Sequence, residues 1–359
     1  MKPERFARAL DLLRDAVASR AFPGCSLAVM HRGEPVASTG FGRFTYEPQS
    51  PEVAADTIFD VASLTKIVAT TAMAMILYER GMLDLDLPME SVVREFFATD
   101  PRRQDVTLRT LLAHTSGLPG YVRLFEQART RDELVLAACR TPLEAAPGER
   151  TEYSDIGFII LGEALARIAD EPLDSFCRRE VFGPLGMATT CFNPPPAQRS
   201  LIPPTEDDRA FRHRVIQGEV HDENAGVMGG VAGHAGLFAS APDLARFAQA
   251  ILGCLTRPGA KTIFLPETLR AFARPQAAKS GSPRALGFDL PTAPSQSGRH
   301  FSPGSLGHLG FTGTSLWLDP ERELAIVLLT NRTWPDRSSQ EIKRVRPGVH
   351  DAIVEALSW

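Results

Sequence analysis

The feature that most constrains the fold is a long, predominantly apolar segment in the first quarter of the chain, Ile67 to Leu77. A helix that is apolar nearly all round must be buried on every side, so we expect a central helix over Ser63–Glu79 that ends at Gly81. The segment is shorter than the roughly 20 residues that span a bilayer. It therefore predicts a core helix.

This helix begins with Ser63-Leu-Thr-Lys66. Side chains three positions apart share one face of a helix, so we expect the Ser63 hydroxyl and the Lys66 ammonium to lie together. A serine needs a base within hydrogen-bond reach to act as a nucleophile, and burial or a nearby cation lowers the pKa of a lysine toward that role. The pattern alone is weak evidence, because it arises by chance in long chains, and an ordinary helix pair is the alternative.

Strand-like segments are found near both ends of the chain. Gly24–Met30 and Pro35–Phe41 predict a hairpin, and Ser315–Leu318 and Glu323–Thr330 predict two more strands. One further strand is predicted at Ala285–Leu290, inside a loop rich in Gly, Ser and Pro. The predicted helices outside the central one are Pro3–Ser19, Val106–Thr115, Arg131–Cys139, Ile156–Ala169, Pro242–Leu252 and Lys343–Leu357.

The order of these elements predicts the architecture. Strands at the two ends of the chain can share one sheet only if the helical middle is an insertion. We therefore expect an α/β (α+β) fold, with an antiparallel sheet flanked by helices from residues 1–60 and 240–359. An inserted, mostly helical domain is expected from residues 61–239. A cleft between the two domains is the expected place for a small-molecule site.

Composition argues against several classes of function. The 359 residues carry a formal net charge of −4, which predicts no binding of nucleic acid and no basic membrane-surface helix. The five cysteines include no C-x-x-C pattern, which favours reduced thiols. Because zinc-ligand spacings and H-E-x-x-H are also missing, we expect neither a metal nor a cofactor. A small-molecule substrate is the expected partner, and the oligomeric state is left open.

The N-terminal segment does not look like a secretory signal. Asp11, Arg14 and Asp15 interrupt its apolar residues. A cytoplasmic location is therefore expected for the chain as given, or a periplasmic or secreted one if a leader was removed.

Two further motifs follow along the chain. Tyr153-Ser-Asp155 lies in the helical region, and His308-Leu-Gly310 opens a strand-like segment near the C-terminus. The order S-x-x-K, Y-x-[N/D], [K/H]-x-G resembles the penicillin-binding protein and serine β-lactamase superfamily. Its class C-like branch, with DD-carboxypeptidases, D-amino peptidases and esterases, is the most similar one. The resemblance runs from about Pro23 to Asn331 and implies a β-lactamase/transpeptidase-like fold. Other similar stretches are Leu111–Pro119, Gly230–Phe238 and Gly310–Pro320.

The resemblance implies a role for each motif. Ser63 would be the acylated nucleophile, and Lys66 would accept or relay its proton. Tyr153 would be the second proton-handling group, with a pKa lowered by Lys66 or His308. The backbone N–H groups of Ser63 and Phe311 would form the oxyanion hole.

The resemblance also assigns Asp155, His308, Leu309 and Gly310 to substrate binding. Many relatives have Asn in place of Asp155, whose carboxylate would help to keep Lys66 charged; Asp155 is also a candidate cap for the following helix. His308 is near-neutral at pH 7 and Leu309 lacks a hydroxyl, which weakens the case for an efficient β-lactamase. At Gly310 a side chain would crowd a substrate lying along the strand.

These inferences converge on a serine hydrolase that acts through an acyl-enzyme on Ser63. It would cleave a small ester or amide, such as a D-alanyl peptide, a β-lactam or a carboxylic ester. The alternative is a non-catalytic β-lactamase-fold protein that serves as a binding or scaffold module.

The stretch Glu206–Arg214 is expected to be a solvated loop of mixed charge. Four residues are assigned either to ordering a loop beside the cleft or to contacting substrate: His221, Asp222, Glu223 and His234.

Overall fold

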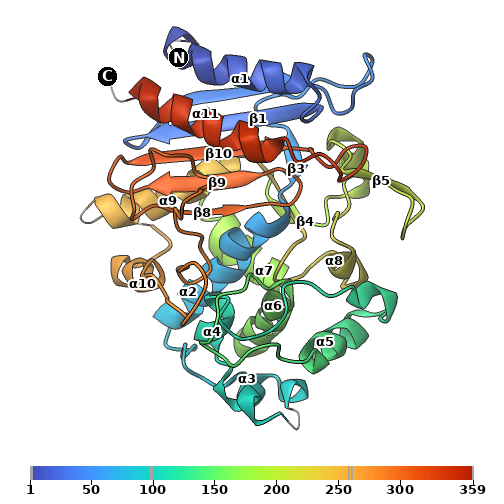
Figure 1. Cartoon of the computed structure of the whole chain (residues 1–359), viewed down its shortest axis with the longest axis vertical. Coiled ribbons are helices and arrows are strands. Elements are labelled where there is room, and N and C mark those ends of the chain that lie inside the picture. Colours follow the sequence, from blue (N-terminus) through green and yellow to red (C-terminus); the bar gives the residue numbers. More distant parts are fainter. Residues whose placement is uncertain (1–2, 98–99, 258, 260–261, 358–359) are drawn as a thin grey trace.

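The computed structural model describes residues 3–97, 100–257, 259 and 262–357. Its main sheet has five strands in the order β2-β1-β10-β9-β8 (Figure 1). Neighbouring strands are antiparallel, so the predicted sheet shared by the two ends of the chain is confirmed. The strands are β1 (Gly24–His31), β2 (Glu34–Gly42), β8 (Leu306–Leu309), β9 (Ser315–Asp319) and β10 (Leu324–Thr330).

The sheet is apolar on both faces. Successive side chains of a strand point to opposite faces. In β1 and β10, Leu27 and Ile326 belong to the core on one face, whereas Ala28 and Val327 belong to the core on the other. Because both faces are covered, all of β10 is buried.

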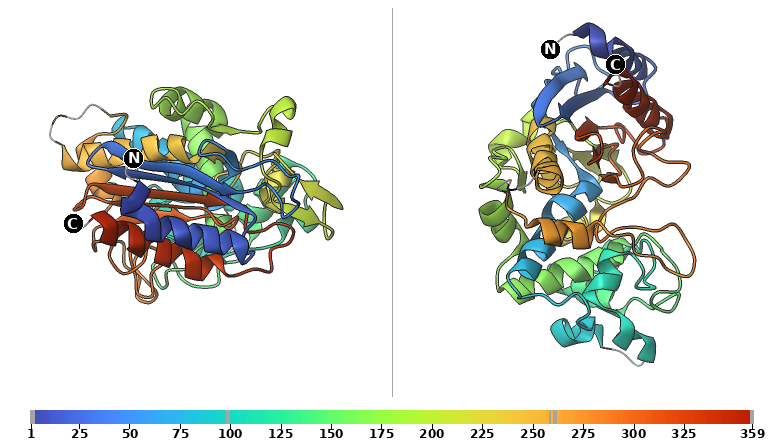
Figure 2. Two further views of the ribbon diagram at one scale, coloured as in Figure 1. Left: turned by 90° about the horizontal axis from the view of Figure 1, so that it is seen from above. Right: turned by 90° about the vertical axis from the view of Figure 1, so that its left-hand side faces the viewer.

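Helices from distant parts of the chain cover the two faces. The helices α1 (Ala7–Ala18) and α11 (Ile342–Leu357) lie side by side on one face, and α9 (Ala241–Thr256) lies on the other (Figure 2). Both terminal helices bury one apolar stripe and expose a polar one. The predicted helices at the two ends of the chain are thereby confirmed.

The central segment is buried as expected, but it is not one regular α-helix. It consists of a 3-10 turn (Ala62–Leu64), a π-helical stretch (Lys66–Thr71) and α2 (Ala72–Glu79). Wider π turns are frequently found at functional sites. Gly81, with φ of 68°, turns the chain just after the helix, as the sequence predicts.

The middle of the chain holds most of the remaining helices. Its two small sheets are β3-β7-β4 and β5-β6. Their strands are β3 (Ile58–Asp60), β4 (Cys191–Phe192), β5 (Glu206–Asp208), β6 (Arg214–Ile216) and β7 (Leu237–Ser240). The helices are α3 (Met89–Val92), α4 (Leu108–Leu112), α5 (Arg131–Arg140), α6 (Asp155–Ala169), α7 (Leu173–Cys177) and α8 (Glu223–Val227), and a further helix, α10 (Pro266–Phe272), follows α9. The division of the chain into two domains stays a prediction.

Two predicted elements are wrong in detail. The helix expected over Val106–Thr115 covers Leu108–Leu112 alone, because His114 has a left-handed φ of 57° that ends the helix. The strand expected at Ala285–Leu290 is reduced to a single bridge between Asp289 and Gly307. Within the described ranges, no helix combines the length and the apolar character that a membrane crossing needs.

Candidate active site

Ser63 stands where β3 leads into the central helix. It occupies the middle of the 3-10 turn Ala62–Leu64. The preceding residue, Ala62, has φ of 47°, a left-handed conformation that is uncommon for any residue except glycine. Backbone strain of this kind is concentrated at functional sites.

Lys66 is fully buried next to Ser63. Its Nζ donates to Ser63 Oγ at 3.0 Å, to Asp155 Oδ1 at 2.6 Å and to the carbonyl oxygen of His234 at 3.0 Å. An ammonium group has three donors, and each of them has an acceptor here. The structure therefore brings the predicted pair together and adds a carboxylate to it.

Two opposing effects act on the protonation of Lys66. Burial lowers its pKa, and the neighbouring Asp155 carboxylate opposes this effect without cancelling it. The ion pair that the sequence suggested is present and favours the charged lysine, as expected, while desolvation is the larger effect and the net shift of the pKa is downward. A lysine with a lowered pKa is better suited to accept a proton.

Tyr153 lies just before α6, and Ser154 is the residue that caps this helix. The Ser154 hydroxyl accepts from the backbone N–H of Gly157 at 3.0 Å and donates to the carbonyl of Pro119 at 2.6 Å. The prediction that Asp155 caps the helix is therefore wrong. Because Ser154 takes this role, the Asp155 side chain is free to point at Lys66.

The Tyr153 ring contacts several site residues. Lys66 Nζ lies 4.8 Å from its centroid, and the rings of His114 and His308 lie at 4.7 and 5.7 Å. Burial and the Asp155 carboxylate raise the pKa of Tyr153 well above its ordinary value, whereas hydrogen bonding with Ser63 works in the opposite direction. The expected lowering of this pKa is wrong, because desolvation is the dominant effect. The ring is a neutral phenol at physiological pH.

The motif His308-Leu-Gly310 ends β8 and does not open a strand. Gly310 donates its N–H to the Thr314 carbonyl at 2.8 Å and accepts from the Gly313 N–H at 3.0 Å. A Cβ at position 310 would lie 1.9 Å from Thr314 Oγ1 and 2.5 Å from the Val61 carbonyl oxygen. Glycine is required here by this close approach of protein atoms, and the expected crowding of substrate is not needed to explain it.

His308 is buried and neutral. Its Nδ1 donates to the carbonyl of Leu309 at 2.8 Å, which leaves Nε2 as an acceptor. Burial, together with the charges of Arg284 and Lys66, lowers the pKa of His308 well below its ordinary value. Nε2 has no protein partner. This residue therefore supplies no positive charge for a substrate carboxylate, in line with the expectation from the sequence.

Phe311 follows Gly310 at the rim of the site, and its side chain is 48% exposed. Arg332 Nε donates to the Phe311 carbonyl at 2.8 Å, and the guanidinium carbon lies 4.5 Å from the ring centroid. The Phe311 ring also stacks on the His221 ring, with the two ring centroids 5.7 Å apart. Both the main chain and the ring of Phe311 are thus held by polar groups of other segments.

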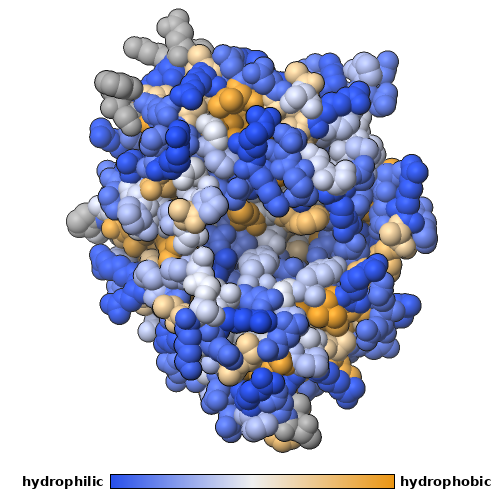
Figure 3. Space-filling model, in the orientation of Figure 1, coloured by the Kyte–Doolittle hydropathy of each residue, from blue (hydrophilic) through white to orange (hydrophobic). Residues whose placement is uncertain are grey.

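These residues meet in a cleft with a volume of about 650 Å³. The space-filling view shows a hollow near the middle of the face that Figure 1 presents (Figure 3). Lys66 is not among the lining residues and lies behind Ser63. All other predicted site residues line the cleft: Ser63, Tyr153, Asp155, His308, Leu309, Gly310 and Phe311.

The lining of the cleft also includes cations that the sequence analysis missed. Arg284 pairs with Asp289, and its guanidinium carbon lies 5.3 Å from the Tyr153 ring centroid. Its buried Nε and Nη2 have no protein acceptor. Lys343 and Arg346 at the start of α11 also line the cleft, and burial lowers the pKa of Arg346 to about 9. No sequence pattern identifies Arg284, because it lies in an irregular loop.

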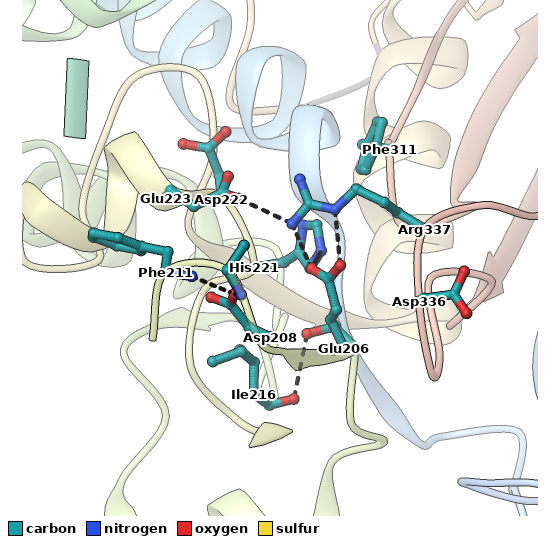
Figure 4. Close-up of polar contacts among 12 residues, drawn as sticks. Glu206, Asp208, Phe211, Ile216, His221, Asp222, Glu223, Phe311, Asp336 and Arg337 are labelled. Carbon is teal, nitrogen blue, oxygen red and sulfur yellow. Dashed lines mark hydrogen bonds and ion pairs between the residues drawn. The ribbon is translucent and has the colours of Figure 1, made fainter. Parts of the chain in front are cut away.

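The stretch predicted as a solvated loop forms the β5-β6 hairpin, and Glu206 at its start is buried. Figure 4 shows Glu206, His221 and Arg337 converging beside Phe311. His221 Nε2 lies 2.8 Å from Glu206 Oε2, and Arg337 bonds both Glu206 and Glu223. Sequence reasoning missed this buried ion network because Arg337 is far from Glu206 along the chain.

The remaining candidates near the rim also have protein partners. His234 Nε2 lies 2.8 Å from Asp222 Oδ1, and Asp222 caps α8 through the Ala225 N–H at 2.8 Å. These contacts order the loop, while His221, Asp222, Glu223 and His234 also line the cleft. Across the described part of the chain, no group of three or more His, Cys, Asp or Glu residues is placed to hold a metal ion.

Comparison with known proteins identifies relatives along nearly the whole chain. N-acetylmuramyl-L-alanine amidase of Bacillus subtilis (strain 168) is 30% identical, over 90% of this chain and 80% of that protein. A protein of Escherichia coli O157:H7 named "Putative D-alanyl-D-alanine carboxypeptidase" is also 30% identical, over 87% of this chain and 79% of its own length.

Solved structures have the same fold at lower identity. EstCE1, a hydrolase with promiscuous acyltransferase activity, matches with a TM-score of 0.78 and 22% identity over 98% of both chains. The octameric penicillin-binding protein homologue from Pyrococcus abyssi matches with a TM-score of 0.74 and 21% identity, over 98% of this chain and 77% of that one. At such identities these structures establish the fold alone. The sequence model of the Beta-lactamase family matches residues 10–347, and the chain therefore belongs to this family of hydrolases.

Proposed function

We propose that this chain is a serine hydrolase that forms an acyl-enzyme on Ser63. The observation that carries the proposal is the 3.0 Å contact between Lys66 Nζ and Ser63 Oγ, made by a lysine that is fully buried. A nucleophile within hydrogen-bond reach of a base, itself oriented by a third group, is the geometry that covalent catalysis needs. Asp155 is the third group in this site.

Lys66 is the favoured first proton acceptor. When the Ser63 oxygen attacks the acyl carbon, its proton passes to Lys66 in its unprotonated form, which the lowered pKa makes more accessible. Tyr153, a neutral phenol in contact with Ser63, then gives its own proton to the leaving group as the bond to that group breaks. Lys66 returns a proton to the Tyr153 oxygen, and attack of water on the acyl-enzyme reverses the sequence.

The backbone N–H groups of Ser63 and Phe311 are proposed as the oxyanion hole. The carbonyl of Gly310 is bonded to the Gly313 N–H at 3.0 Å. In a trans peptide the C=O and the N–H point in opposite directions, so this bond also fixes the direction of the Phe311 N–H. Donors that are fixed before the reaction stabilise the transition state most effectively.

The substrate class that fits best is an amide or ester with a carboxylate near the scissile bond. Arg284 has two buried nitrogens without a protein acceptor, and an arginine binds a carboxylate in a bidentate way. Lys343 and Arg346 add positive charge to the lining of the cleft. The names of the two relatives at 30% identity, N-acetylmuramyl-L-alanine amidase and "Putative D-alanyl-D-alanine carboxypeptidase", both refer to cleavage of an amide, and the second also to a substrate with a terminal carboxylate.

The test is covalent labelling followed by intact-protein mass spectrometry. A fluorophosphonate probe is expected to add once to the wild-type chain and not at all to Ser63→Ala. The matched control is Ser26→Ala, which removes a buried hydroxyl that bonds the Ala55 carbonyl at 2.7 Å outside the cleft, and it is expected to be labelled like the wild type. A wild type that remains unlabelled would support the non-catalytic alternative.

Incubation with a penicillin separates the substrate classes. A Ser63-dependent adduct, or Ser63-dependent ring-opened drug, would favour a D-alanyl peptide or a β-lactam as substrate. Intact drug beside a chain that the fluorophosphonate labels would favour another amide or ester.

A further inference from the structure

Asp60 is a buried carboxylate that the proposed reaction does not use. It ends β3, three residues before Ser63, and is 2% exposed. Its Oδ1 accepts from the Ala62 N–H at 2.8 Å, and its Oδ2 accepts from the His221 N–H at 2.7 Å. Its carbonyl oxygen accepts from Thr312 Oγ1 at 2.8 Å. One residue therefore bonds the nucleophile turn, the cleft loop and the turn after β8.

The first of these contacts falls on the strained residue. Ala62 is held at φ of 47°, a conformation that an alanine leaves readily unless its surroundings fix it. The hydrogen bond from its N–H to Asp60 Oδ1 is such a constraint. Because Ala62 directly precedes Ser63, any relaxation of its backbone would move the Ser63 side chain away from Lys66 Nζ.

The second and third contacts reach the other side of the cleft. His221 stacks on Phe311, so holding the His221 backbone also limits the position of that ring. The Thr312 hydroxyl ties the residue after Phe311 directly to Asp60. A parallel bond joins Thr314 Oγ1 to the Val61 carbonyl at 3.0 Å. The two segments that carry the proposed oxyanion donors are therefore connected through residues 60 and 61.

We propose that Asp60 is a positioning residue that sets the geometry of Ser63 relative to the turn that carries Phe311. The inference rests on the proposed function, because it concerns the acylation of Ser63. Two backbone N–H groups approach the two carboxylate oxygens, so both oxygens must accept. An asparagine has one acceptor oxygen and would present N–H donors to the second backbone N–H, although its shape is nearly the same.

The burial of Asp60 also points to a role other than stabilising the fold. A buried carboxylate is costly unless it is well hydrogen-bonded. Desolvation raises the pKa of Asp60, and the N–H groups of His221 and Ala62 counteract this effect only in part. Its carboxylate oxygens accept from the backbone N–H groups of Ala62 and His221, so its contribution is directional.

The experiment measures acylation of full-length Asp60→Asn by the fluorophosphonate, with the rate constant and the reversible affinity of the probe determined separately. We expect the rate constant to fall about ten- to a hundredfold, the scale set by one unsatisfied buried hydrogen-bonding group, with the affinity unchanged. The control is Asp319→Asn, another buried aspartate that accepts from backbone N–H groups, at Ser302 and Glu321, outside the cleft. It is expected to react at the wild-type rate.

The Ala62→Gly background distinguishes a positioning role of Asp60 from a general contribution to the stability of the fold. Glycine adopts a left-handed φ without strain, so it should remove part of the need for Asp60. We expect Asp60→Asn to slow acylation less in the Ala62→Gly background than in the wild type. An equal loss in both backgrounds would show that Asp60 does not act through Ala62 and would overturn the inference.

The outcomes separate this inference from the proposed function. Labelling of Asp60→Asn at the wild-type rate overturns the inference and leaves the proposed function intact, whereas an unlabelled wild type removes both. If Asp60→Asn does not fold, Asp60→Glu tests the same contacts. It keeps the charge and both acceptor oxygens but displaces them by one methylene, and a rate constant equal to that of the wild type would then overturn the inference.

Discussion

Two cations beside the Tyr153 ring, Lys66 on the central helix and Arg284 in an irregular loop, differ in how they are bonded. Each of the three donors of Lys66 has an acceptor within the protein. Arg284 has one carboxylate partner, Asp289, and two buried nitrogens without a protein acceptor. A fully bonded cation is held in the fixed geometry that proton transfer needs, whereas an incompletely bonded one can still bind a ligand. We therefore expect Lys66 to determine kcat and Arg284 to determine KM.

The largest expected effect is that of Lys66→Met. It removes the amine that lies 3.0 Å from Ser63 Oγ, and general-base catalysis contributes about 10²- to 10⁴-fold. We expect kcat for a p-nitrophenyl ester to fall about a thousandfold. Lys343→Met, which removes another cation of the cleft lining, is the matched variant, and it is expected to raise KM for a carboxylate-bearing ester with little change in kcat. A similar kcat for the two variants would contradict the proposed difference between the two kinds of cation.

Tyr153→Phe is expected to lower kcat by about a hundredfold, the usual scale of general acid–base help. The ring would keep its packing against the His114 ring, at 4.7 Å between centroids. The loss of activity would therefore measure the contribution of the Tyr153 hydroxyl. Steady-state kinetics with the same ester provide the measurement. A loss below about threefold would instead make Lys66 the sole proton carrier.

Arg284→Gln combined with Asp289→Asn tests the second cation, Arg284. The double change removes the ion pair as a unit and leaves no unpaired buried charge. We expect KM for a substrate with a carboxylate beside the scissile bond to rise about tenfold or more, the scale of hydrogen bonds to charged groups. A neutral ester serves as the control, with a similar KM in both proteins. An equal rise for both substrates would show that Arg284 shapes the cleft without recognising charge.

The smallest expected effect concerns the rim of the cleft. Burial by itself would raise the pKa of Glu206, but hydrogen bonds from His221 and Arg337 outweigh it and lower the pKa from 4.5 to about 2. The ionised form therefore adds stability above pH 4.5 that is lost as the pH falls toward 2. We expect Glu206→Gln to lower the free energy of unfolding by about 1–3 kcal/mol at pH 7. Urea unfolding should show this difference shrinking between pH 4.5 and 2, and a difference that is constant with pH would contradict the assigned ion pair.

Much of the fold follows from the sequence. Apolar runs such as Glu323–Thr330 predict buried strands because both faces of the sheet are covered. The end of the helix at His114 could not be predicted, since its left-handed φ is stabilised by distant partners: the ring accepts the backbone N–H of Ser154 at 2.9 Å. Tertiary contacts of this kind override local propensity.

The candidate site was predictable to the extent that its residues form short patterns. Ser63 and Lys66 are neighbours on one helical turn, so their contact follows from local geometry. The direction in which the pKa of Tyr153 is shifted could not be predicted. It depends on how deeply the ring is buried, and no sequence pattern reports the burial of a single residue. Arg284 and Arg337 were missed because each reaches the cleft from an irregular loop.

The pairing of β1 with β10 has a consequence for folding. Cys25 pairs with Thr330, so the centre of the sheet joins segments from opposite ends of the chain. Contacts between such distant segments form slowly, because closing the long intervening loop costs entropy before any contact can stabilise the closed loop. During synthesis, the β1-β2 hairpin has no partner strand along the edge of β1 until β10 leaves the ribosome. The chain is therefore expected to depend on protection from aggregation for most of its synthesis.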